Sequence, residues 1–82
     1  MKVFVTGVAG QLGYDVVNEL DRRGHNCIGS DIAPAYAGVQ DGSAAARAEY
    51  VSLDITNAAA VLAAIRAARP DAVVHCAAWT QV

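Results

Sequence analysis

The chain has 82 residues, enough for one small domain whose core supplies only a few kcal/mol of net stability. Hydrophobic residues make up 55% of it, although alanine, which buries little area, accounts for much of that share. The formal net charge is −2 and there is no basic stripe, which argues against a nucleic-acid partner. No apolar run is long enough to span a membrane, and residues 1–12 lack the apolar core of a signal peptide, so the sequence favours a cytoplasmic protein without a membrane partner.

The first part of the chain predicts a strand, a helix and a second strand. Residues 2–6 (KVFVT) are β-branched and aromatic and precede a glycine, as in a strand that is buried on both faces. Helical spacing then relates four apolar residues, Leu12, Val16, Val17 and Leu20. Gly24 is suited to end this helix, and residues 25–29 predict the second strand.

The alternation continues in the second part of the chain. Residues 33–48 carry a proline, glycines and scattered alanines, which predict a loop with a helical turn near 43–48. The remaining predicted elements are strands at 50–53 and 72–76 and, between them, a helix that begins at Thr56 or Asn57 and ends near Ala68 before Pro70.

This pattern predicts an α/β fold, a Rossmann-like parallel sheet of about four strands with helices packed on both faces. The expected strand order is 3-2-1-4, and the domain is expected to be truncated. In that order Cys27 and Cys76 lie on opposite sides of the first strand, which excludes a disulfide between them. We interpret both as small buried apolar residues.

Three glycines, Gly7, Gly10 and Gly13, lie between the first predicted strand and helix, in the stretch VTGVAGQLGYDV. A strand that turns at once into a helix points unpaired N–H groups at the space above the sheet edge, which suits an anion. Gly7 would allow the tight turn, Gly10 the approach of a pyrophosphate, and Gly13 close packing of the helix against the first strand. Because the spacing G-x-x-G-x-x-G differs from the fingerprint G-x-G-x-x-G, a merely tight strand-to-helix turn is the alternative.

Two aspartates end predicted strands. Asp31 ends the second strand, where a carboxylate can accept hydrogen bonds from the adenosine ribose hydroxyls and repel a 2′-phosphate. Asp31 therefore favours NAD(H), although NADP(H) stays open, and the alternative is a solvated loop aspartate. Asp54 follows the third strand and either holds an adenine amino group or begins the turn into the next helix.

These residues carry a resemblance to a known family. The chain resembles the extended short-chain dehydrogenase/reductases in TGVAGQLG, Asp31, LDIT and HCAAWT. Within them it is most similar to the dTDP-4-dehydrorhamnose reductase family, in GQLGYDVVNEL and RPDAVVHCAAWTQV. The resemblance covers nearly the whole chain but only the N-terminal portion of the family's chain. It implies that residues 1–82 are the dinucleotide-binding portion of an oxidoreductase of dTDP-rhamnose biosynthesis, with no second domain and with a dTDP-sugar bound only by the complete enzyme.

The resemblance also implies which residues meet the cofactor. They are Gly10, Gln11 and Leu12 at the pyrophosphate, Asp31 at the adenosine ribose, Asp54 and Ile55 at the adenine, and Ala77, Ala78, Trp79 and Thr80 toward the nicotinamide. The chain departs from the family at two places. Residues 33–49 form a longer segment than expected, and Cys76 stands where relatives often have asparagine.

The family's catalytic pair is missing from these residues. The resemblance implies a Tyr-x-x-x-Lys pair, in which the tyrosine transfers a proton as hydride moves and the lysine lowers the pKa of the tyrosine. None of the three tyrosines has a lysine four positions later, and Lys2 is the only lysine. We therefore expect a piece of a reductase that binds cofactor weakly and does not catalyse alone.

Two other functions stay open. One is another extended family member, such as a nucleotide-sugar epimerase or dehydratase, and the other is a non-catalytic nucleotide-binding module. Neither His25 nor His75 has partners at a spacing that suggests a triad or a metal site, and we interpret His75 as a core imidazole hydrogen-bonded to a neighbour. An exposed edge on the fourth strand would favour self-association.

Overall fold

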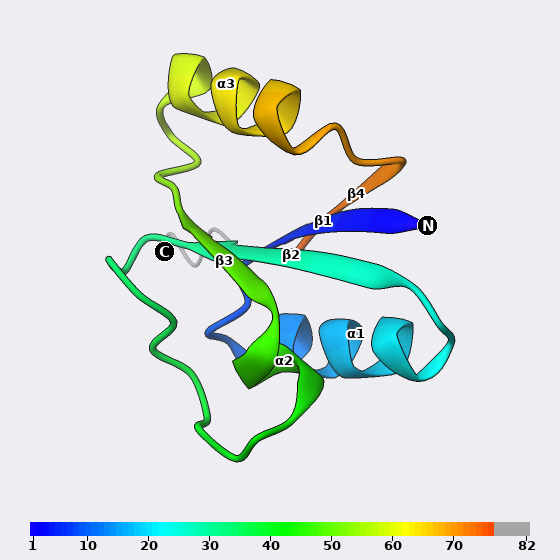
Figure 1. Ribbon diagram of the computed structural model, residues 1–82. Coiled ribbons are helices and arrows are strands. Elements are labelled where there is room, and N and C mark those ends of the chain that lie inside the picture. Colours follow the sequence, from blue (N-terminus) through cyan, green and yellow to red (C-terminus); the bar gives the residue numbers. More distant parts are fainter. Residues whose placement is uncertain (77–82) are drawn as a thin grey trace.

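Four parallel strands form one sheet in the computed structural model, which describes residues 1–76 (Figure 1). The elements are β1 (Lys2–Thr6), α1 (Gln11–Arg22), β2 (Asn26–Asp31), α2 (Ala44–Arg47), β3 (Glu49–Ser52), α3 (Ala58–Ala68) and β4 (Ala72–His75). The strand order is β3-β2-β1-β4, and every neighbouring pair is parallel. The predicted Rossmann-like sheet and its order are confirmed.

Helices cover both faces of the sheet, with α1 and α2 on one side and α3 on the other (Figure 1). Successive residues of β1 therefore enter two different cores. Val3 and Val5 pack on the side of α1, whereas Phe4 packs on the side of α3, and all three are buried. A strand covered on both faces needs apolar residues at successive positions, which explains the apolar run of β1.

The ends of the helices follow the predicted turn chemistry. Gly24 follows α1 with a φ of 87°, a conformation that favours glycine. Of the two predicted caps for α3, Asn57 has this role, because its side chain accepts a hydrogen bond from Ala60 N at 3.1 Å. The helix ends at Ala68, and its C-cap residue Arg69 has a left-handed φ of 49° directly before Pro70.

The structure corrects several local predictions. β2 begins one residue later than expected and extends to Asp31. Leu12 was expected on the apolar face of α1 but is 62% exposed, because it lies in the first turn of the helix and faces an open groove. His75 is exposed rather than part of the core, although it does bond a neighbour. Cys27 and Cys76 are both free, as the strand order requires, but they are half-buried rather than buried.

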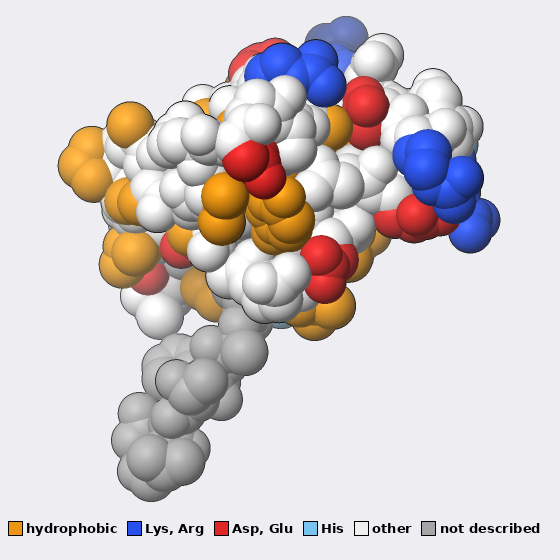
Figure 2. Space-filling view, turned by 90° about the horizontal axis from the view of Figure 1, so that it is seen from below, with side chains coloured by type: hydrophobic (Ala, Val, Ile, Leu, Met, Phe, Trp, Pro, Cys, Tyr) orange, Lys and Arg blue, Asp and Glu red, His pale blue; other side chains and the backbone are white. Residues whose placement is uncertain are grey.

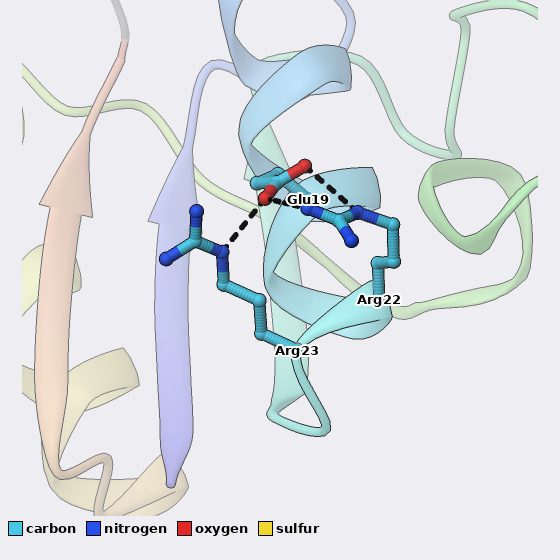
Figure 3. Close-up of polar contacts among 3 residues, drawn as sticks. All are labelled: Glu19, Arg22 and Arg23. Carbon is cyan, nitrogen blue, oxygen red and sulfur yellow. Dashed lines mark hydrogen bonds and ion pairs between the residues drawn. The ribbon is translucent and has the colours of Figure 1, made fainter.

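Acidic and basic side chains are interspersed on the side of the molecule that carries α1 and α2, and no continuous basic surface covers this face (Figure 2). At the end of α1, Glu19 forms ion pairs with both Arg22 and Arg23 (Figure 3). Among residues 1–76, no helix has the length and apolar character needed to cross a membrane.

Candidate functional site

A groove of about 380 Å³ opens at the carboxyl edge of the sheet, where β1, β2 and β4 end. Its lining residues are Gly7, Gly10, Gln11, Leu12, Gly13, Asp31 and Cys76. The first six are residues for which the sequence predicted a role at the cofactor. Ligands of open α/β sheets bind outside the carboxyl ends of the strands, so the groove lies where this fold class places its sites.

The turn between β1 and α1 is anchored on the neighbouring strand. Gly7 N and Val8 N both donate to Ser30 O, at 2.8 and 3.2 Å. Gly7 has a φ of 77°, which a residue with a side chain adopts only with strain. Glycine at this position is therefore required by the backbone path itself.

Gly13 is required by a close contact. A Cβ built on Gly13 would lie 2.2 Å from Gly7 O and 2.8 Å from Val8 Cα. The sequence predicted close packing of the helix at Gly13, with β1 as the partner. In the structure the partner is the turn that follows β1, and this contact brings the start of α1 over the sheet edge.

Gly10 differs from the other two glycines because the fold does not require it. It has a φ of −83°, and a Cβ there would make only an ordinary contact, 3.6 Å from Gly7 O. The missing side chain instead leaves open the part of the groove beside the first turn of α1. A ligand could therefore approach the backbone closely at Gly10.

The N-terminus of α1 offers hydrogen-bond donors to this groove. Tyr14 N makes the first bond of the helix, to Gly10 O at 3.0 Å, so the N–H groups of Gln11, Leu12 and Gly13 precede the intrahelical bonds. Gly10 supplies no side-chain cap, and the first turn contains no acidic residue. Free donors and the positive end of the helix dipole make this terminus suitable for an anion.

Asp31 lines the same groove, and its carboxylate is anchored by two backbone groups. One oxygen accepts from Ala9 N at 2.9 Å, and the other accepts from Ile32 N at 2.8 Å. A carboxylate has about four acceptor positions, so Asp31 can accept further bonds from a ligand. Asp31 thus ties the glycine turn to β2 and presents negative charge in the groove.

Cys76 completes the lining, although the sequence analysis noted it only as a departure from the family and did not include it among the cofactor residues. Its backbone N donates to Thr6 O at 3.1 Å, which continues the pairing of β4 with β1 to the sheet edge. Burial raises the pKa of its thiol. The signal that could have found Cys76 is its position directly after β4, at the edge where Gly7 and Asp31 also lie.

Of the remaining predicted residues, the two that the structure describes, Asp54 and Ile55, do not line the groove. The Asp54 carboxylate accepts from Thr56 N at 2.9 Å and from Thr56 Oγ1 at 2.6 Å, and these bonds lower the pKa of Asp54. Asp54 therefore begins the turn toward α3, one of its two predicted roles, while contact of Asp54 and Ile55 with adenine stays a prediction. Ala77, Ala78, Trp79 and Thr80 lie outside the described residues.

The part of the chain that the structure describes contains no group of three histidine, cysteine or acidic residues that could hold a metal ion. His75 Nδ1 lies 2.8 Å from Thr6 Oγ1, so this ring is hydrogen-bonded to a neighbour as predicted. Within residues 1–76, the groove offers a ligand backbone donors and the Asp31 carboxylate.

Known proteins are similar to this chain in sequence. The family model described as RmlD substrate binding domain matches residues 1–82. The chain is 42% identical over 78 residues to dTDP-4-dehydrorhamnose reductase of Streptomyces griseus and 41% identical over 76 residues to a 3-diazoavenalumate denitrifying reductase of a Streptomyces species. These matches cover 95% and 92% of this chain but only 20% and 22% of the relatives, so the chain spans about a fifth of their length.

Solved structures of known enzymes contain a similar fold. UDP-glucose-4-epimerase of Stenotrophomonas maltophila, with bound NAD and formylated UDP-arabinopyranose, superposes with a TM-score of 0.76 at 30% identity over 100% of this chain and 26% of its own. The sheet order, the glycine turn and the match along the whole sequence agree with one another. The chain belongs to the RmlD family of the extended short-chain dehydrogenase/reductases, a nucleotide-sugar reductase and epimerase superfamily with a Rossmann fold.

Proposed function

We propose that this chain is the NAD(H)-binding portion of a dTDP-4-dehydrorhamnose reductase, which reduces the C4 keto group of dTDP-4-dehydro-L-rhamnose to give dTDP-L-rhamnose. The observation that carries the proposal is the groove, in which the uncapped N-terminus of α1 and the Asp31 carboxylate line one space. Two curated relatives named as reductases and a solved relative with bound NAD support it. A cytoplasmic location is part of the same proposal.

Each part of the groove has a role in this proposal. The N–H groups at the start of α1 would bind the pyrophosphate, whose close approach Gly10 permits. Asp31 would accept hydrogen bonds from the adenosine ribose hydroxyls, and a 2′-phosphate there would place a second anion beside its carboxylate. The chain therefore favours NADH over NADPH. The remaining proposed contacts are Asp54 and Ile55 at the adenine and Ala77, Ala78, Trp79 and Thr80 toward the nicotinamide.

The reduction needs more than these residues. The reduced nicotinamide, when bound, supplies the hydride that the C4 carbonyl carbon accepts. The groove residues bind and orient the cofactor, whereas the carbonyl oxygen needs a proton donor such as a Tyr-x-x-x-Lys pair, which these 82 residues lack. We therefore propose that residues 1–82 bind NADH without catalysing the reaction.

The proposal is tested by turnover of the full-length protein with dTDP-4-dehydro-L-rhamnose. A reductase consumes NADH in a one-to-one ratio with the sugar. The second candidate is a nucleotide-sugar epimerase, favoured by the likeness to UDP-glucose-4-epimerase, and it would bind NAD without net consumption of NADH. Failure of the protein to bind either NADH or NAD would refute both enzyme assignments.

A further inference from the structure

The glycine turn that follows β1 is attached to β2 by three successive backbone donors. Gly7 N and Val8 N share Ser30 O as their acceptor, at 2.8 and 3.2 Å. Ala9 N, the next donor along the chain, bonds the Asp31 carboxylate at 2.9 Å. The first part of the turn is therefore held by the backbone of β2, whereas Ala9 is held by a side chain.

Packing adds to the attachment of the first part of the turn. Val8 is buried, and a Cβ built on Gly29 of β2 would lie 3.0 Å from Val8 Cγ1. The missing side chain at Gly29 therefore makes room for Val8. Because Gly7 and Val8 keep these contacts without Asp31, removal of the Asp31 carboxylate should release Ala9 while the turn stays attached to β2.

Ala9 leads directly into the donors that suit an anion. It precedes Gly10, the N-cap residue of α1, whose carbonyl accepts the first bond of the helix from Tyr14 N. The N–H groups of Gln11–Gly13 precede the intrahelical bonds. The bond from Ala9 N to Asp31 fixes the peptide group on the amino side of Ala9, two residues before the helix begins. The carboxylate therefore helps to set the direction in which the chain enters the helix.

We propose that Asp31 is also a positioning residue for the pyrophosphate, which acts through Ala9 N to hold the end of the glycine turn and the first turn of α1 in the form that binds a diphosphate. This inference rests on the proposed function, because it takes a dinucleotide as the ligand. Asp31 accepts from Ala9 N with one oxygen and from Ile32 N with the other. Each oxygen keeps a further acceptor position, so the same carboxylate can hold the turn and accept from ribose hydroxyls together.

The two proposed roles of Asp31 make opposite predictions for a ligand without ribose hydroxyls. The probe is 2′,3′-dideoxy-ADP, which keeps the diphosphate but lacks both hydroxyls that the carboxylate would bind. If Asp31 served the ribose alone, Asp31→Ala would only remove a negative charge from the groove, and dideoxy-ADP would bind equally well or more tightly. If Asp31 holds the turn, the same variant should bind dideoxy-ADP more weakly.

The test measures the dissociation constants of ADP and dideoxy-ADP for the full-length protein by titration calorimetry. Hydrogen bonds to charged groups are strong but lose part of their effect when exposed, so we expect Asp31→Ala to raise the constant for dideoxy-ADP about threefold. The constant for ADP should rise further, by about tenfold or more, because ADP also loses the bonds from its ribose hydroxyls.

A matched control is Asp21→Ala, which removes a carboxylate of α1 that lines a different cavity, beside Cys27. It should leave both dissociation constants unchanged. Hydrogen exchange of the Ala9 amide in the unaltered protein decides the question if Asp31→Ala does not fold. Dideoxy-ADP should slow this exchange, because a bond that favours diphosphate binding is favoured by diphosphate binding in return.

Three results would overturn the inference. They are equal or tighter binding of dideoxy-ADP by Asp31→Ala, no binding of dideoxy-ADP by an unaltered protein that binds NADH, and exchange of the Ala9 amide that dideoxy-ADP does not slow. In each case the unaltered protein still binds NADH, so the proposed function stands. If the unaltered protein binds neither NADH nor NAD, the proposed function fails and this inference fails with it.

Discussion

The substitution Gly13→Ala tests the close contact between α1 and the glycine turn. The new Cβ would lie 2.2 Å from Gly7 O and 2.8 Å from both Gly7 C and Val8 Cα. These are backbone atoms, so no side chain can rotate away, and the helix or the turn must move by roughly 1 Å to restore even a tight contact. Overpacking of this kind destabilises the folded state by about 1–3 kcal/mol, and the higher helix propensity of alanine offsets up to about 1 kcal/mol of this loss.

We therefore expect Gly13→Ala to lower the free energy of unfolding by about 2 kcal/mol, a large part of the few kcal/mol that the core of a chain of this length supplies. Urea unfolding followed by circular dichroism measures this. With an m-value of about 1 kcal/mol/M, the midpoint should fall by about 2 M. A midpoint equal to that of the unaltered protein would refute the contact as the reason for glycine at this position.

The matched control is Gly10→Ala, which changes a neighbouring glycine of the same motif. Its Cβ would lie 3.6 Å from Gly7 O at an ordinary φ of −83°, so the urea midpoint should stay within about 0.5 M of the unaltered value. The same Cβ would occupy the space proposed for the pyrophosphate. Gly10→Ala should therefore weaken NADH binding by about tenfold or more, in contrast to its small effect on stability.

Two further predictions concern charge. Asp31→Asn removes the anion that repels a 2′-phosphate, so the ratio of the NADPH to the NADH dissociation constant should fall by about tenfold, and an unchanged ratio would remove Asp31 as the source of the preference. Hydrogen bonds from Arg22 and Arg23 lower the pKa of Glu19 to about 2 from 4.5 (Figure 3). Because the pKa of Glu19 is lower in the folded state than in the unfolded state, its ionised form stabilises the folded state at pH values above the unfolded-state pKa. This contribution is lost as the pH falls toward 2. The melting temperature should accordingly fall more between pH 5 and pH 2 for the unaltered protein than for Glu19→Gln, and equal falls would contradict a stabilising role for these ion pairs.

Much of the fold could be predicted because its signals are local. The apolar run of β1 ends at a glycine, and Gly24 and Asn57 stand at helix ends where their conformations and side chains are needed. Alternation of strands and helices together with right-handed crossovers then leaves few topologies. The six predicted residues at the groove follow from the same logic, since the turn after β1 and the end of β2 meet at one sheet edge.

The features that could not be predicted depend on contacts between distant residues. Tyr14 and Asp41 are 27 positions apart and meet across an irregular segment, so no spacing rule relates them. Helical spacing placed Leu12 on the apolar face, but spacing does not show that the first turn of α1 borders an open groove. The alternating pattern also could not show that the α3-side face of β4 is only partly covered, which leaves His75 exposed.

The most direct test of the dinucleotide groove uses the two cysteines of the chain. Cys76 lines the groove, whereas Cys27 lines a separate cavity of about 360 Å³ beside Lys2, Asn26 and Glu49, the first residues of three strands. Burial raises the pKa of both thiols, so alkylation is best followed at about pH 8.5, where the thiolate fraction is larger.

The measurement is the rate of alkylation of each cysteine, read by peptide mass spectrometry with and without NADH. At a tenfold excess of NADH over its dissociation constant, about one site in eleven stays free, so alkylation of Cys76 should slow about tenfold. Alkylation of Cys27 should be unchanged. Protection of Cys27 instead, or no protection of Cys76 when NADH is bound, would contradict the assignment of this groove as the cofactor site.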